Sequence, residues 1–410
     1  MEDYEIYTLP NGLRIVHKQV SNTRIVHCGF IMDIGSRDEK PEQQGIAHFW
    51  EHMAFKGTKR RKAFHIINRL ESVGGELNAY TSKEKICFYA SVLDNYFGNA
   101  VELLSDITFD SIFPEKQIEK ERGVILEEMA MYHDAPEDAI QDDFDISIFG
   151  SHPLGHNILG TADTVRSFHR EDFRRFIHEN MNTGRVIFSS VGPLPMKKVI
   201  RQVEKYVKDV PTMNAAPDRV LFKGYQPNNK TVHRELTQAQ CAIGSTAFAA
   251  DDDQRLPFFM LLNILGGPGM NSRLNLALRE KYGFVYSVDA TYTPYTDTGM
   301  FGVFFGTEPR QVNKSMKLVL KEMKKLREVP LGTLQLHRAK EQLIGQLAMA
   351  EENNMNFMLM MGKSLLDLDR IDSLEDVFMS IRNVSSAHLQ DLANEIFNER
   401  TLSYLTYLPK

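Results

Sequence analysis

The sequence has few cysteines, no excess of positive charge and no long hydrophobic run, and each shortage excludes a class of protein. Its three cysteines, Cys28, Cys87 and Cys241, match no zinc-ribbon or disulfide spacing and fit a reducing compartment. The net charge of −6 disfavours nucleic acid as the main partner. No apolar run approaches the roughly 20 residues that span a bilayer, and the first six residues contain no signal-peptide core. We therefore expect a cytoplasmic protein with neither a nucleic-acid nor a membrane partner.

The most informative pattern lies in residues 48–58, His-Phe-Trp-Glu-His-Met-Ala-Phe-Lys-Gly-Thr. On a helix, residues four apart lie one above the other with Cβ atoms about 5–6 Å apart, so His48 and His52 can bind one metal ion. Glu51 lies on the same side and can accept a proton from a metal-bound water. The order His-x-x-Glu-His is the inverse of the commoner His-Glu-x-x-His zinc-protease helix. The alternative is an amphipathic helix with two exposed histidines.

A third ligand is required, because a catalytic zinc ion normally has three protein ligands and a water. The predicted helix 114–133 contains Glu121 and Glu128, which are two helical turns apart and share one face. Glu128 is flanked by three apolar residues, Val124, Ile125 and Met129. These indicate a buried carboxylate, which needs a partner. We predict Glu128 as the third ligand and Glu121 as a residue that supports a ligand; a solvated helix surface is the alternative.

Two strands are predicted at 74–81 and 86–92. The first, Gly-Gly-Glu-Leu-Asn-Ala-Tyr-Thr, is polar for a strand inside a core, which is typical of a sheet edge. An extended peptide could add to such an edge as one more strand and be held through its backbone. A hairpin edge without a ligand is the alternative.

The order of predicted elements repeats in the second half of the chain. A segment rich in proline and asparagine, residues 210–230, has the composition of a linker. The elements after it include an apolar helix at 256–265 and long helices at 310–327 and 332–360. This parallel indicates two similarly folded domains of about 200 residues. The helix at 256–265 offers no metal ligand, so we expect only the first domain to bind metal.

These patterns together resemble the pitrilysin/insulinase family of zinc peptidases, most closely the small bacterial members and the mitochondrial processing peptidase β subunit. The resemblance covers nearly the whole chain. One residue departs from the family pattern, Trp50, where an aliphatic residue is more usual. The segments that carry the resemblance are residues 48–52 and 55–58, residues 78–81, Glu121 with Glu128, and residues 279–287.

The resemblance implies an α+β fold in which each domain is an antiparallel-rich sheet flanked by helices, one half of a clamshell. The domains expected are a zinc-binding catalytic domain at 1–212, a linker at 213–230 and a second domain without metal at 231–410. The second domain is expected to supply Arg279 and Tyr286 to catalysis. A homodimer with an active site shared between subunits is implied, and whether Arg279 and Tyr286 act within one chain or across the dimer is open.

The resemblance also implies the role of each site residue. Zn²⁺ is bound by His48, His52 and Glu128, and Glu121 supports the site. Glu51 is the general base. The substrate-binding strand consists of Leu77, Asn78, Ala79, Tyr80 and Thr81.

The expected function is that of a zinc-dependent metalloendopeptidase, which hydrolyses unfolded peptides with a zinc-bound water activated by Glu51. Two alternatives remain. One is a non-catalytic partner or scaffold subunit of a peptidase complex, and the other is a site-specific presequence-processing peptidase.

Overall fold

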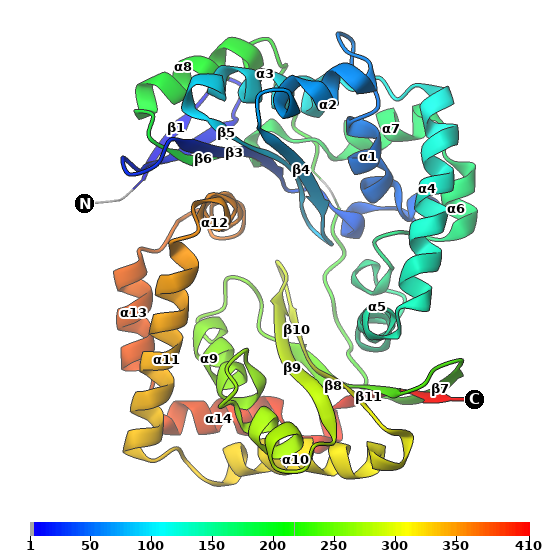
Figure 1. Cartoon of the computed structure of the whole chain (residues 1–410), viewed down its shortest axis with the longest axis vertical. Helices are drawn as coiled ribbons and strands as arrows, with labels where there is room; N and C mark the ends of the chain where they lie inside the picture. The colour runs from blue at the N-terminus through cyan, green and yellow to red at the C-terminus, as the bar shows by residue number, and fades with distance from the viewer. Residues whose placement is uncertain (1–3, 217) are drawn as a thin grey trace. The chain divides into compact units, whose positions relative to one another are not determined.

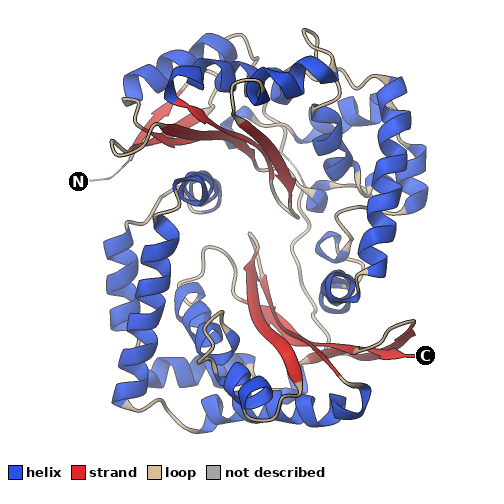
Figure 2. Ribbon diagram, in the orientation of Figure 1, coloured by secondary structure: helices blue, strands red, loops and turns tan. Residues whose placement is uncertain are grey.

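The computed structural model describes residues 4–216 and 218–410, in which the strands form one six-stranded and one five-stranded sheet with helices packed against them (Figures 1 and 2). The chain divides into two compact units. The first contains the residues up to Met129, His156–Val220 and Met349–Ser373; the second contains Ala130–Gly155, Leu221–Ala348 and Leu374–Lys410. The predicted α+β class is confirmed. The two units differ from the predicted contiguous halves, because each also takes in a segment from the other half of the sequence.

The sheet of the first unit has the strand order β1-β2-β6-β3-β5-β4. Strands β2 and β6 are parallel, and all other neighbours are antiparallel. Strand β4 lies at one edge. The strands are β1 (Glu5–Thr8), β2 (Arg14–Gln19), β3 (Ile25–Met32), β4 (Glu76–Thr81), β5 (Ile86–Leu93) and β6 (Val186–Gly192).

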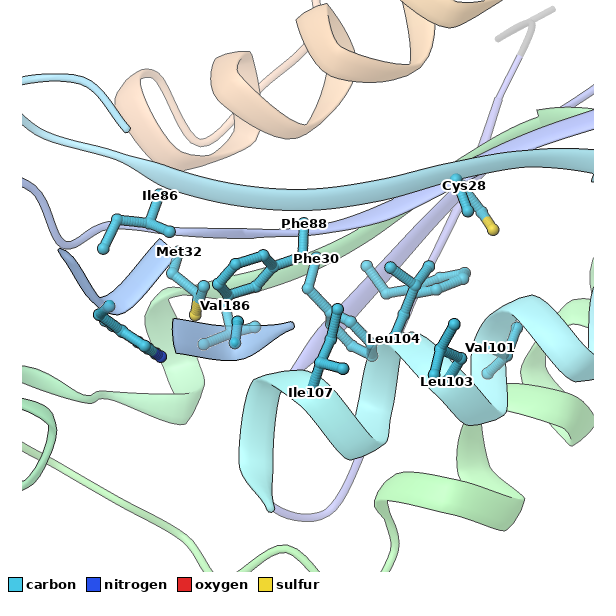
Figure 3. Close-up of a cluster of buried hydrophobic side chains, with 14 of the residues drawn as sticks. Cys28, Phe30, Met32, Ile86, Phe88, Val101, Leu103, Leu104, Ile107 and Val186 are labelled. Carbon is cyan, nitrogen blue, oxygen red and sulfur yellow. The ribbon is translucent and has the colours of Figure 1, made fainter. Parts of the chain in front are cut away.

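One face of this sheet forms the main core of the first unit. Alternate residues of a strand point to one face, so Phe30 of β3 and Phe88 of β5 lie on the same side. They pack with Leu104 and Ile107 of helix α3 (Phe97–Phe109), as Figure 3 shows. The other helices that lie wholly or mostly in the first unit are α1 (Ile46–Ala54), α2 (Ala63–Glu71), α4 (Glu115–Asp134), α6 (Ala162–Ser167), α7 (Arg170–Asn180), α8 (Met196–Val207) and α12 (Asn354–Asp367).

The opposite face of the sheet is covered by α12, which comes from the second half of the sequence. Met358 and Met361 of α12 pack against Ile31 and Cys87 of the sheet. The predicted single helix at 332–360 is therefore wrong. Helix α11 ends at Glu351, and the Asn353 side chain accepts hydrogen bonds from the backbone N–H groups of residues 355 and 356, so that it caps the start of a new helix.

The second unit repeats the strand directions of the first. Its strand order is β7-β11-β8-β10-β9, with β7 and β11 parallel and the other neighbours antiparallel, which matches β2-β6-β3-β5-β4. The strands are β7 (Asn229–Arg234), β8 (Ala239–Ala247), β9 (Val285–Pro294), β10 (Gly299–Thr307) and β11 (Ser403–Pro409). The helices are α5 (Pro136–Phe149), α9 (Arg255–Gly266), α10 (Val312–Glu328), α11 (Thr333–Glu351), α13 (Leu374–Asn383) and α14 (Ser386–Ile396).

None of the helices in the described part of the chain is long and apolar enough to cross a bilayer.

Candidate metal centre

Helix α1 carries His48, Glu51 and His52 on a segment anchored by its apolar residues. Phe49, Trp50 and the other apolar residues of the helix are fully buried in the core of the first unit. Trp50 packs edge-on against Phe88, with ring centroids 6.1 Å apart. The unusual tryptophan therefore lies behind the helix, away from the polar residues of the motif.

The two imidazoles converge with a carboxylate from α4. Ligand atoms of His48, His52 and Glu128 all lie within 4.8 Å of one another. The Nε2 atom of His48 is 3.7 Å from Oε1 of Glu128, and Nε2 of His52 is 3.4 Å from Oε2. Zinc bonds of about 2.0–2.1 Å place tetrahedral ligand atoms about 3.3 Å apart. Two imidazole nitrogens and one carboxylate at these separations fit a zinc ion with one coordination position left open.

The three apolar residues near Glu128 were expected to be buried, and two of them pack in or against the core. Ile125 is fully buried and Met129 packs partly against the core, but Val124 is 50% exposed. The side chain of Glu128 is 24% exposed. The helix therefore presents Glu128 at the border of the core, where the carboxylate reaches both histidines.

Glu121 orients one of the histidines. Its Oε1 lies 3.2 Å from Nδ1 of His52, and its Oε2 lies 2.8 Å from Nζ of Lys56. A proton on Nδ1 that is donated to Glu121 leaves the Nε2 lone pair of His52 free to bind a cation. The Nδ1 atom of His48, in contrast, is buried and makes no hydrogen bond within residues 4–216 and 218–410.

The surroundings shift the pKa values of these groups in opposite directions. Burial and the neighbouring His52 lower the pKa of His48 to about 4, although Glu128 opposes this. Burial also acts to lower the pKa of His52, but hydrogen bonds to Glu121 and Glu128 outweigh it and raise the pKa to about 9. The hydrogen bond from His52 lowers the pKa of Glu128. A cation that binds Nε2 of His52 must displace a proton, because metal ligands bind deprotonated.

Glu51 faces the end of the edge strand. Its Oε2 accepts a hydrogen bond of 2.6 Å from the Thr81 hydroxyl. Burial raises the pKa of Glu51, and this bond opposes the rise only in part. A raised pKa brings a carboxyl group nearer to the range in which it exchanges protons with water at neutral pH.

The predicted substrate strand is β4. Its residues pair with β5 on one side, and β4 has no further strand neighbour within the described residues. Leu77 and Ala79 pack on the core side of the sheet, where Thr81 also reaches Glu51. Tyr80 points to the opposite face and packs with α12. Asn78 lies between Leu77 and Ala79 along the strand and pairs with Tyr89 of β5.

Arg279 and Tyr286 belong to the second unit. Arg279 lies in the helical turn Asn275–Glu280 and Tyr286 near the start of β9. The Arg279 guanidinium carbon is 5.6 Å from the centroid of the Tyr286 ring, and Tyr286 is 85% exposed. The structure thus pairs these two residues with each other on the surface of their unit.

The sequence did not indicate Glu39, which holds the start of α1. Its two carboxylate oxygens accept hydrogen bonds of 2.9 and 2.8 Å from the backbone N–H groups of Gly45 and Ala47. Gly45 has a φ of 93°, which a residue with a side chain rarely adopts. Glu39 is 4% exposed, and burial raises its pKa well above the usual value. A capping side chain normally belongs to the N-cap residue itself, so a glutamate six positions earlier gives no local signal.

Lys56 was also missed, although a signal existed. It lies two residues past the end of α1, in the segment that follows the motif directly, and its Nζ reaches Glu121 from there. A positive side chain at this position suits the carboxylate of Glu121.

Comparisons with known proteins assign both halves of the chain. Residues 14–162 match the model of the insulinase family (peptidase family M16), and residues 167–343 match the model described as the peptidase M16 inactive domain. The four residues His48, Glu51, His52 and Glu128 all lie within the first match.

Relatives of similar length align over nearly the whole chain. The uncharacterized zinc protease YmxG of Bacillus subtilis is 33% identical over 96% of this chain and 95% of its own. The uncharacterized zinc protease SCO5738 of Streptomyces coelicolor is 35% identical over 96% and 87%. A probable mitochondrial-processing peptidase subunit beta of Arabidopsis thaliana is 29% identical over 97% and 77%.

A solved structure confirms the fold. The crystal structure of a protease from Helicobacter pylori has a TM-score of 0.92, with 20% identity over 100% of both chains. A crystal structure titled as the peptidase M16 inactive domain from Pseudomonas fluorescens also has a TM-score of 0.92, with 18% identity over 99% of this chain and 98% of that chain.

Replacing Glu121 should weaken zinc binding without removing a ligand. In Glu121→Gln, the weaker acceptor no longer holds the His52 tautomer or Lys56, and we expect zinc affinity to fall about 10–100-fold. Competition with a chromophoric chelator measures this. Glu119→Gln is the matched control, because the Glu119 side chain is 75% exposed. Equal affinities of the two variants would contradict the role of Glu121.

Replacing Glu39 should loosen α1. Glu39→Ala leaves the N–H groups of Gly45 and Ala47 without their acceptors, and each buried unsatisfied group destabilises a fold by about 1–3 kcal/mol. We expect a lower urea midpoint and faster amide hydrogen exchange in residues 46–54. Glu42→Ala, on an exposed neighbour, should leave both unchanged. Unaltered exchange in α1 of Glu39→Ala would show that the cap is dispensable.

Proposed function

Because the chain belongs to the insulinase family of peptidases, M16, we propose that it is a zinc-dependent endopeptidase that hydrolyses unfolded peptides. The observation that carries the proposal is the convergence of His48, His52 and Glu128, with the ligand atoms 3.4 to 3.7 Å apart across the Glu128 carboxylate. Relatives named zinc proteases support the choice of metal.

Each of the site residues in the first unit has its own role in hydrolysis. His48, His52 and Glu128 hold the ion, and Glu121 keeps His52 in the tautomer that binds. Bound zinc supplies a Lewis acid that lowers the pKa of water to about 7 and polarises a carbonyl group. Glu51 accepts the proton of the attacking water and later returns it to the leaving amine. The Thr81 hydroxyl holds Glu51 at the end of the edge strand.

The substrate is proposed to bind as an additional strand on β4. Backbone hydrogen bonds along Leu77–Thr81 would hold an extended peptide whatever its side chains, and alternate side chains would point to the two faces of the sheet. An unfolded peptide offers an extended backbone of this kind, whereas the backbone groups of a folded domain are already paired. The preferred substrates are therefore peptides and unfolded chains.

Arg279 and Tyr286 are proposed to stabilise the oxyanion of the reaction, as the family resemblance implies. Removing one such donor lowers the rate about 10²–10³-fold in other enzymes. The donor pair could come from the same chain or from a second copy in a homodimer. Mixing a metal-free variant with an Arg279→Ala variant distinguishes these cases, because only a shared site regains activity.

A non-catalytic partner subunit is the alternative, and the term "inactive domain" for residues 167–343 raises it. That segment contains none of the four residues His48, Glu51, His52 and Glu128. The alternative requires a chain that lacks zinc-dependent cleavage, which the following experiment measures.

The decisive variant is Glu51→Gln. It preserves the size of the side chain and the metal ligands but removes the proton acceptor, so we expect normal zinc content and a loss of cleavage of about 10²–10⁴-fold. Plasma emission spectrometry measures the zinc, and a fluorogenic peptide with and without chelator measures the cleavage.

Two further variants make this experiment specific. His52→Ala should lose both zinc and cleavage, because a ligand is gone. Glu71→Gln, on an exposed position of α2, should retain both. Full cleavage by Glu51→Gln would refute the base assignment, and a zinc-loaded wild type that cleaves no peptide would favour the non-catalytic subunit.

A further inference from the structure

We infer that Lys363 of α12 forms a subsite beside β4 that selects an acidic side chain in the bound peptide. This inference rests on the proposed function, because it describes the substrate preference of the same site. It involves only residues of the first unit, since α12 packs on the sheet of that unit.

The two faces of β4 offer different surroundings to a bound peptide. Thr81 points to the face of Glu51, and Tyr80 points to the face of α12. In a strand added to β4, side chains opposite one another lie on the same face. The side chain of the substrate residue opposite Tyr80 therefore points toward α12. The substrate residue opposite Thr81, one position along, lies beside Glu51.

Lys363 of α12 lies against Tyr80 on this face of β4. Its Nζ atom is 4.8 Å from the centroid of the Tyr80 ring. The neighbouring carboxylate, Asp367, is bound at 2.5 Å by Nζ of Lys85, which is 7% exposed. No carboxylate lies within ion-pair distance of Lys363 in the part of the chain that the structure describes. Asp367 is therefore paired with Lys85, and Lys363 has no ion-pair partner of its own among the described residues.

The surroundings favour a negative partner for Lys363. Burial lowers the pKa of Lys363, and the positive charge of Lys85 acts in the same direction, whereas Cys87 and Asp367 oppose the shift without cancelling it. A partly buried ammonium group without a counter-charge is unfavourable. A substrate aspartate or glutamate would supply that charge and a charge-assisted hydrogen bond, which is stronger than a bond between neutral groups. A lysine or arginine at the same substrate position would be repelled.

The test compares quenched fluorescent peptides that differ only by Glu or Gln at one position, with that position moved along the sequence. We expect wild-type kcat/KM to favour Glu over Gln about tenfold at one position near the cleaved bond, the size of one hydrogen bond to a charged group. Lys363→Met removes the charge but keeps a long unbranched side chain beside Tyr80, and it should reduce the ratio to about one. Lys363→Glu should favour Lys at that position.

Two controls separate charge from packing. Lys363→Arg retains the charge and should retain the preference for Glu. Lys197→Met makes the same chemical change on an exposed position of α8 and should leave the ratio unchanged.

The outcomes distinguish this inference from the proposed function. Zinc-dependent cleavage with a Glu-to-Gln ratio of one at every position would overturn the subsite and leave the peptidase standing. Binding of the same peptides to Glu51→Gln, measured by fluorescence polarisation, gives a readout that needs no cleavage. Equal affinities for the Glu and Gln peptides there would also overturn the subsite, and a preference for Glu that Lys363→Met abolishes would support it.

Discussion

A carboxylate from α4 meets two imidazoles from α1, and this contact sets the geometry of the candidate metal centre. Neither helix can form the centre alone. Helix α1 is held by its buried apolar residues and by Glu39, whose carboxylate binds the first N–H groups of the helix. Helix α4 is held by Ile118 and Ile125 in the same core. The position of the ligands is therefore a consequence of how two helices pack against one sheet.

Further polar contacts hold the residues around the candidate metal centre and the end of the edge strand. Glu121 joins His52 to Lys56, and Thr81 joins Glu51 to β4. The centre and the edge strand thus form one structural unit, within a part of the chain that shares a single core.

The two units share a fold but differ in the side chains of the corresponding helices α1 and α9. The sheets of the two units have the same strand directions, and β9 corresponds to β4. Yet α9 is almost wholly apolar, with Phe258 and Leu262 buried, whereas α1 directs His48 and His52 toward Glu128 of α4. Strand directions follow from chain connectivity and packing, so they persist while the side chains of one helix change. The family assignment agrees with this division, because the two halves match separate models of peptidase family M16.

Local spacing along the chain was enough to predict several features of the fold and of the candidate site. The His48–His52 spacing, the Glu121–Glu128 face and the repeated order of elements can all be read from helical and strand periodicity, and the resemblance to the pitrilysin/insulinase family is confirmed. Only the tertiary structure decided the contacts between distant segments. Glu39 caps a helix from outside the usual capping position, and Asn353 ends one helix and begins another. The segment after Asn353 then crosses to the first unit, where it brings Lys363 to Tyr80. These contacts depend on the packing of the whole chain, which no short sequence pattern encodes.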